Sequence, residues 1–117
     1  MAAIRLKRVY DLPAPSDGTR ILVDRLWPRG LKRADAAVNI WARESAPSAE
    51  LRRWFGHAPA RWQEFRWRYR QELTARPDEL ARLAEAARAG PVTLLFAARD
   101  ETRNNAVVLK EILEAMA

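Results

Sequence analysis

The sequence predicts one compact α/β domain spanning residues 1–117, in which helices flank a small, mostly parallel sheet of three to four strands. Three observations support this class. A length of 117 residues suits a single domain with a core of its own. Strand-like apolar segments alternate along the chain with segments of helical periodicity. Such alternation is typical of parallel sheets covered by helices.

Four segments have the pattern of strands. Residues 4–9 alternate apolar with basic side chains, as in a half-buried strand. Residues 19–23 and 92–97 are more continuously apolar, which predicts inner strands that are covered on both faces. Residues 38–41 alternate again and are a candidate for a short additional strand.

The remaining segments carry helix signals. We expect one short helical turn at residues 31–35 and helices at 48–55, 59–75, 78–89 and 102–116. Ser48 and Asp78 are suitable N-cap residues, and Gly90 suits the end of the helix before the last strand. Helical spacing also predicts that Trp54, Trp62 and Trp67 pack in the core.

Composition excludes several classes of chemistry. The chain has no cysteine, which excludes a disulfide framework and a thiolate nucleophile. With a single histidine, His57, it cannot build a His-rich zinc site. It also lacks a phosphate-binding P-loop, a dinucleotide-binding glycine motif and a nucleophile elbow. We therefore expect no cofactor.

The sequence gives no sign of export or membrane insertion. No apolar run approaches the roughly 20 residues of a membrane span. The N-terminal segment lacks the long apolar stretch and the cleavage pattern of a signal peptide. We expect a cytoplasmic protein without a membrane partner.

The charge is strongly basic, with 21 Lys and Arg against 15 Asp and Glu, a net charge of +6. Part of this basicity is consistent with the codon bias of a GC-rich genome, since the chain is rich in Arg and Ala. The functional interpretation is an anionic partner, because the guanidinium fork matches phosphate or carboxylate.

The segment 23–30, Val-Asp-Arg-Leu-Trp-Pro-Arg-Gly, follows the second strand and combines an acid, two arginines and a tryptophan before a closing glycine. Polar residues also follow the other strands: Tyr10 and Asp11, Arg43 and Glu44, and Arg99 and Asp100. Parallel strands would bring these residues to one edge of the sheet, where open α/β sheets bind ligands.

The residue types at this edge predict an anion site. Arg25, Arg29 and Arg99 would bind the anion, assisted by Tyr10, by Asn104 and by free backbone N–H groups near residues 102–104. Asp24 and Asp100 are the candidate catalytic residues, as acid and base; alternatively they orient the arginines or hold a hard cation such as Mg²⁺.

Each of these residues also has a structural interpretation. Asp–Arg pairs at strand ends often form bridges that fix loops. Trp27 is more simply a loop anchor packed on the core than a stacking platform. His57 lies in a Gly-His-Ala-Pro break, where a hydrogen bond at a helix junction is favoured over catalysis.

Several motifs resemble one known family. The segment 23–30, Ala-Pro-Ser at 46–48, Gly-His at 56–57, Arg-Trp at 61–62 and Ala-Ala-Arg-Asp at 97–100 are similar to the YeaO-like branch of the domain-of-unknown-function 488 family. The resemblance runs almost end to end and implies a small bacterial cytosolic α/β domain without an assigned activity. Relatives often carry histidines in the segment that corresponds to residues 103–109, which has none here.

Three functional hypotheses follow. The first is binding of a small anionic, phosphate-bearing ligand at the strand-end Arg/Asp cluster, with enzymatic turnover open. The alternative is nucleic-acid binding through the arginine-rich helix at residues 59–75. The third is an interaction domain, monomeric or homodimeric, for which an exposed Trp67 would be the only hint.

Overall fold

A parallel sheet organises this structure, a computed structural model that describes residues 3–116. Within these residues, four strands pair in the order β1-β4-β2-β3. They are β1 (Ile4–Arg8), β2 (Thr19–Leu22), β3 (Ile40–Trp41) and β4 (Val92–Phe96). All three pairings are parallel, which confirms the predicted class and the short strand near residue 40.

The register of the strands aligns their ends. Val92 at the start of β4 pairs with both Ile4 and Thr19, and Leu95 pairs with both Lys7 and Leu22. The carboxyl ends of the strands therefore meet at one edge of the sheet. The loops that leave β1, β2, β3 and β4 all start from this edge.

Both faces of the sheet are covered, which explains the continuous apolar runs of β2 and β4. Ile21, Leu94 and Phe96 belong to the main core under the long helices, whereas Leu22 and Leu95 belong to a smaller cluster on the opposite face. That smaller cluster is closed by the segment after β2, including Trp27 and Leu31 of the loop, and by Ala36 of the short helix α1 (Arg33–Ala36).

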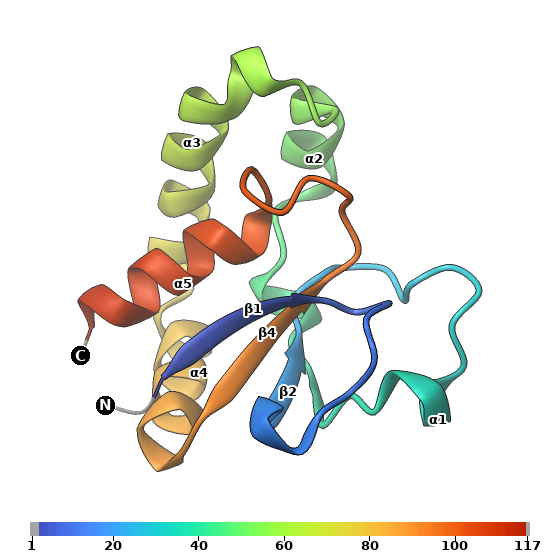
Figure 1. Cartoon of the computed structure of the whole chain (residues 1–117). Coiled ribbons are helices and arrows are strands. Elements are labelled where there is room, and N and C mark those ends of the chain that lie inside the picture. The colour runs from blue at the N-terminus through green and yellow to red at the C-terminus, as the bar shows by residue number, and fades with distance from the viewer. Residues whose placement is uncertain (1–2, 117) are drawn as a thin grey trace.

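The four longer helices lie together on the side of the sheet away from α1 (Figure 1). They are α2 (Ala49–Phe55), α3 (Trp62–Thr74), α4 (Pro77–Ala89) and α5 (Asn105–Ala115). Ser48 is the N-cap of α2, as predicted, because its side chain accepts a hydrogen bond from Leu51 N. The predicted helix at 59–75 begins as a separate 3-10 turn, Pro59–Arg61.

Two predicted helix starts are wrong. Pro77 is the first residue of α4 and Arg76 its N-cap, so Asp78 lies inside the first turn instead of capping it. The last helix begins at Asn105, not Thr102, because Asn104 caps it by accepting a hydrogen bond from Val107 N.

The prediction that three tryptophans are buried is wrong for Trp67, whose exposed fraction is 63%. The inward positions of α3 are Phe65, Tyr69 and Leu73. Trp67 lies two residues from Phe65, which is about half a helical turn, so its side chain leaves the opposite face. Trp54 and Trp62 are half-buried and pack against the core.

Candidate functional site

A pocket of about 380 Å³ lies at the carboxyl edge of the sheet. Its walls come from the loops after β1, β2 and β4, from the segment before α2, from α2 and α3, and from the start of α5. The polar residues that line it are Tyr10, Asp24, Arg25, Arg29, Arg52, His57, Asn104 and Asn105. The predicted edge of the sheet therefore does carry a cavity with charged walls.

Asp24 is the acidic group of this pocket. It follows Val23, and its Oδ2 accepts a hydrogen bond from Ala97 N at 2.9 Å. Its Oδ1 accepts from Asn105 Nδ2 at 3.2 Å, and the same amide nitrogen donates to Val23 O at 2.9 Å. These contacts fix the carboxylate between the exits of β2 and β4. Burial raises the pKa of Asp24, and the hydrogen bonds from Ala97 and Asn105 only partly oppose that effect.

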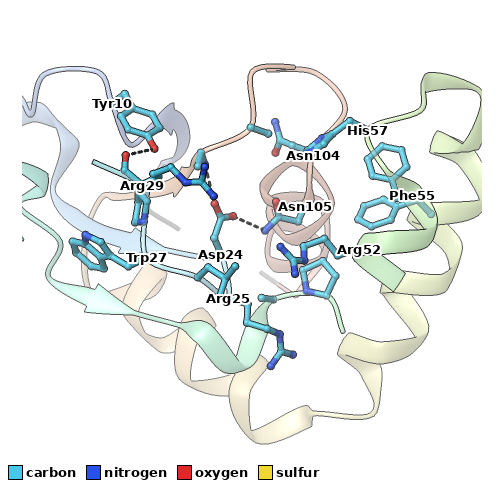
Figure 2. Close-up of a pocket in the computed structure, with 17 residues that line it drawn as sticks. Tyr10, Asp24, Arg25, Trp27, Arg29, Arg52, Phe55, His57, Asn104 and Asn105 are labelled. Atoms are coloured by element: carbon cyan, nitrogen blue, oxygen red, sulfur yellow. Dashed lines mark hydrogen bonds between the residues drawn. The ribbon is translucent and has the colours of Figure 1, made fainter. Parts of the chain in front are cut away.

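Arginines surround this carboxylate without pairing with it. Arg29 and Arg52 extend toward Asp24 from opposite sides of the pocket (Figure 2). Among residues 3–116, Asp24 forms no ion pair with any of them. Arg25 also lines the pocket, and its Nε is buried without a hydrogen-bond partner within the described chain. Three arginines against one aspartate give the pocket a net positive charge.

Aromatic side chains form the apolar part of the wall. Phe55 of α2 stacks on Phe65 of α3 with ring centroids 4.4 Å apart, and the His57 ring lies 6.0 Å from Phe55. Trp27 packs edge-on against Trp41 at 5.4 Å. Its Nε1 donates to Leu31 O at 2.7 Å, so Trp27 anchors its loop while also lining the pocket.

The structure brings together five of the predicted site residues: Tyr10, Asp24, Arg25, Arg29 and Asn104 all line the pocket. Tyr10 contributes through a hydrogen bond from its hydroxyl to Arg29 O at 2.9 Å, which joins two of the loops. Asn104 is buried because it caps α5. Asp24 and Arg25 are adjacent in sequence, yet the Arg25 guanidinium extends away from the Asp24 carboxylate (Figure 2).

Arg99 and Asp100 do not line this pocket. The Asp100 carboxylate instead organises its own loop, accepting hydrogen bonds from Thr102 N and Arg103 N and pairing with the Arg103 guanidinium, each at 3.0 Å. The hydrogen bond from Thr102 N, followed by that from Arg103, lowers the pKa of Asp100. The backbone N–H groups predicted to be free for an anion are therefore already occupied at residues 102 and 103.

Sequence reasoning missed Arg52 as a site residue and favoured a structural role for His57. Arg52 lies one turn into α2, so its place depends on how that helix packs beside the sheet. His57 has a φ of 56° directly after the C-cap Gly56, as suits a helix junction, and its ring lines the pocket. The hydrogen bond expected for His57 at this junction is not found, since no hydrogen bond among residues 3–116 involves its imidazole.

The arginines of α3 are largely engaged within the molecule. Arg66 Nη2 lies 2.7 Å from Glu111 Oε2, and Arg70 lies 3.5 Å from the other oxygen of the same carboxylate. Arg68 pairs with Glu64 and stacks over the Trp54 ring at 4.4 Å. These contacts reduce the positive charge that this face offers to a partner.

Residues 3–116 contain no group of three or more His, Cys, Asp or Glu side chains that could hold a metal ion. None of the helices in this range is long and apolar enough to cross a bilayer.

The sheet and the pocket define a small parallel α/β domain with an arginine-rich cavity at the carboxyl ends of its strands. The chain belongs to the domain-of-unknown-function 488 family: the family model described as "Inactive DUF488-N3 subclade" matches residues 3–117. This confirms the family resemblance found in the motifs.

Two curated relatives illustrate how closely the family members match. The chain is 46% identical over 113 residues to the uncharacterized protein YeaO of Escherichia coli K12, covering 97% of this chain and 98% of that protein. It is 44% identical over 112 residues to the uncharacterized protein Rv3073c of Mycobacterium tuberculosis H37Rv, covering 94% and 92%. No solved structure matches the chain significantly.

Proposed function

We propose that this protein binds a small anionic ligand, with a phosphate group as the anion, in the pocket at the carboxyl edge of its sheet. The observation that carries the proposal is the approach of Arg29 and Arg52 from opposite sides of one cavity without an ion pair to its carboxylate. Unpaired guanidinium groups beside a cavity are suited to clamp a tetrahedral oxyanion.

The position and size of the pocket support this class of ligand. Ligands of open parallel sheets bind outside the carboxyl ends of the strands. A volume of about 380 Å³ lies at the lower end of the range of small-molecule sites, which suits a compact phosphate ester.

Binding without turnover is the simpler form of the proposal. The matching subclade of the family is described as inactive. Asp100, the second of the two expected acid–base residues, lies outside the pocket and is held by its own loop. The pocket therefore contains no second carboxylate that could act with Asp24 as an acid–base pair. The other ionisable groups that line it are the arginines, Tyr10 and His57.

Isothermal titration calorimetry with inorganic phosphate and with glycerol 3-phosphate tests the proposal. We expect the double variant Arg29→Ala/Arg52→Ala to bind at least tenfold more weakly than the wild type, because the two clamping cations are removed. The matched control is Arg82→Ala/Arg88→Ala, which removes the same charge from exposed positions of α4 and should leave affinity unchanged.

Absence of binding to the wild type, or an equal loss in both double variants, would sink the proposal. Arg99→Ala is a further informative variant. Arg99 was predicted to bind the anion, yet it lies outside the pocket, so we expect its replacement to leave affinity within about twofold of the wild type.

Nucleic-acid binding through α3 is the alternative function, and it has weaker support. Arg66, Arg68 and Arg70 all pair with glutamates of the same molecule. Binding to an oligonucleotide through this face would have to displace those pairs, whereas the pocket arginines need no such exchange.

A further inference from the structure

The pocket contains a carboxylate as well as arginines, which a site for a bare anion does not need. Asp24 would repel phosphate, and burial of its carboxylate costs free energy that its two hydrogen bonds to the protein only partly offset. We propose that Asp24 makes the pocket selective for phosphate esters that also carry a hydroxyl or amino hydrogen-bond donor. This inference rests on the proposed function and states which chemical group the ligand carries in addition to its phosphate.

The first argument is the unused hydrogen-bonding capacity of Asp24. An ionised carboxylate offers about four acceptor positions. The protein fills one on each oxygen, with Ala97 N on Oδ2 and Asn105 Nδ2 on Oδ1. Both donors belong to the framework, namely the exit of β4 and the first residue of α5. The side chain also lines the cavity, so capacity remains for a donor of the ligand.

The second argument is that the pocket arginines do not occupy the remaining acceptor positions of Asp24. In the described chain the paired aspartates are Asp17, with Lys7 and Arg20, and Asp100, with Arg103. Asp24 has arginines on two sides of its cavity and pairs with neither. The pocket arginines and the Asp24 carboxylate therefore do not neutralise each other. The arginines can bind the phosphate of a ligand while Asp24 accepts a hydrogen bond from another part of the same ligand.

The third argument is the apolar part of the wall of the same pocket. Phe55 and Phe65 stack on each other and line the same cavity, so a ligand that fills it displaces water from Asp24. A ligand without a donor would then leave the acceptor positions unsatisfied. Sites built to hydrogen-bond a hydroxyl or amine discriminate strongly against analogues that lack the group, for this reason.

Calorimetry with matched pairs of ligands tests the inference. One pair is glycerol 3-phosphate and propyl phosphate, and the other is phosphoethanolamine and ethyl phosphate. In each pair the phosphate monoester is retained, while the two hydroxyls of glycerol 3-phosphate or the amino group of phosphoethanolamine are removed. We expect the wild type to bind the donor-bearing member of each pair at least tenfold more tightly.

The variant Asp24→Asn should abolish this preference. The amide retains the size of the carboxylate but loses half of its acceptor groups and the charge. Affinity for glycerol 3-phosphate should fall at least tenfold, while affinity for propyl phosphate should stay the same or rise because a repulsive charge is gone. A general loss of structure would lower both affinities, so the ratio within each pair is the diagnostic quantity. Circular dichroism confirms folding, and Asp24→Ala serves as a second variant.

The outcomes separate the two proposals. Equal wild-type binding of both members of a pair overturns the role of Asp24 and leaves the anion site intact. The same conclusion follows if folded Asp24→Asn keeps its preference or loses affinity for both members alike. Failure of the wild type to bind any of these phosphates overturns the proposed function and this inference together. If neither variant folds, the wild-type comparison of the ligand pairs still decides.

Discussion

Two aspartates at opposite ends of β2 show how the same residue type serves structure and site. Asp17 is buried and accepts from Arg20 at 2.5 Å and from Lys7 at 3.1 Å. Burial alone would raise the pKa of Asp17, but hydrogen bonds from Ala14 N, Lys7 and Arg20 outweigh that effect and lower it. Asp24 has no such cation, and its pKa is raised. The paired aspartate stabilises the fold, whereas Asp24 lines the pocket without an ion pair among residues 3–116.

The buried pair yields a stability prediction. Arg20 also donates to Ala36 O and Ala37 O at 2.8 and 3.0 Å, so Arg20→Met leaves a buried carboxylate and two carbonyl groups with fewer partners. We expect a loss of about 3–5 kcal/mol in the free energy of unfolding, measured by urea denaturation. Lys7→Met removes the more exposed partner and should cost about 1 kcal/mol or less. Similar losses in both variants would contradict the buried-pair interpretation.

Gly18 provides a second prediction at the level of one residue. Its φ is +64°, and an added Cβ would lie 2.2 Å from the carbonyl oxygen of Pro91. Gly18→Ala combines backbone strain with a clash against backbone, and we expect a loss of about 3 kcal/mol. Gly30 has a φ of +76° with no atom within 4 Å of the same position, so Gly30→Ala should cost about 1–2 kcal/mol. Equal melting temperatures of the two variants would contradict this ranking.

Residues in the loops that directly follow the strands were the part of the candidate site that the sequence predicted best. Tyr10, Asp24 and Arg29 lie in the pocket because parallel strands bring their exits to one edge, a consequence of topology alone. Arg52 could not be placed in this way, because its position depends on how α2 packs beside the sheet. Arg99 follows β4 as predicted, but neither Arg99 nor Asp100 lines the pocket, and the Asp100 carboxylate is hydrogen-bonded within its own loop.

At the scale of elements, the apolar pattern of the sequence predicted which helices and strands exist better than it predicted where each one begins and ends. The four strands and the long helices follow from apolar periodicity, which the core directly imposes. The start of α5 was wrong by three residues because the chain forms a separate turn at Asp100 and the N-cap is Asn104. Asp100 holds Thr102 N and Arg103 N, so the helix begins only after this turn. Local side-chain hydrogen bonds of this kind leave no periodic trace in a sequence.

The Asp100 turn predicts a pH dependence of stability. The pKa of Asp100 is lowered from its ordinary value of 3.8, so the unfolded chain binds more protons than the folded chain in the range below that value. The contribution of Asp100 is present above the unfolded pKa and is lost as the pH falls through the folded pKa. Asp100→Asn should therefore destabilise the protein at pH 6, and this loss should shrink progressively as the pH is lowered below 3.8, as urea denaturation at a series of pH values from 6 to 2 would show. An effect independent of pH would contradict an ionic role.

At the scale of the whole molecule, the sheet order decides which loops can cooperate. Placing β4 between β1 and β2 brings residues near 10, 24 and 97 together although they are far apart in the sequence. The parallel class was predictable from alternation of strands and helices, but the order was not, because several orders are compatible with the same pattern. The pocket therefore depends on the strand order. The sequence could indicate single residues of the pocket, but it could not predict which of them lie together.

The net charge of +6 also belongs to the whole molecule, and it gives the last prediction. Three double variants each remove two positive charges: Arg29→Ala/Arg52→Ala in the pocket, Arg66→Ala/Arg70→Ala on α3, and Arg82→Ala/Arg88→Ala on α4. Any affinity for a single-stranded oligonucleotide at low salt should fall equally in the α3 and α4 variants, because Arg66 and Arg70 already share the carboxylate of Glu111. A mobility-shift titration measures this, and a steep decrease with salt would identify the contact as nonspecific charge attraction. If the α3 variant lost markedly more affinity than the α4 variant, α3 would be a nucleic-acid surface, and the pocket would lose its place as the leading site.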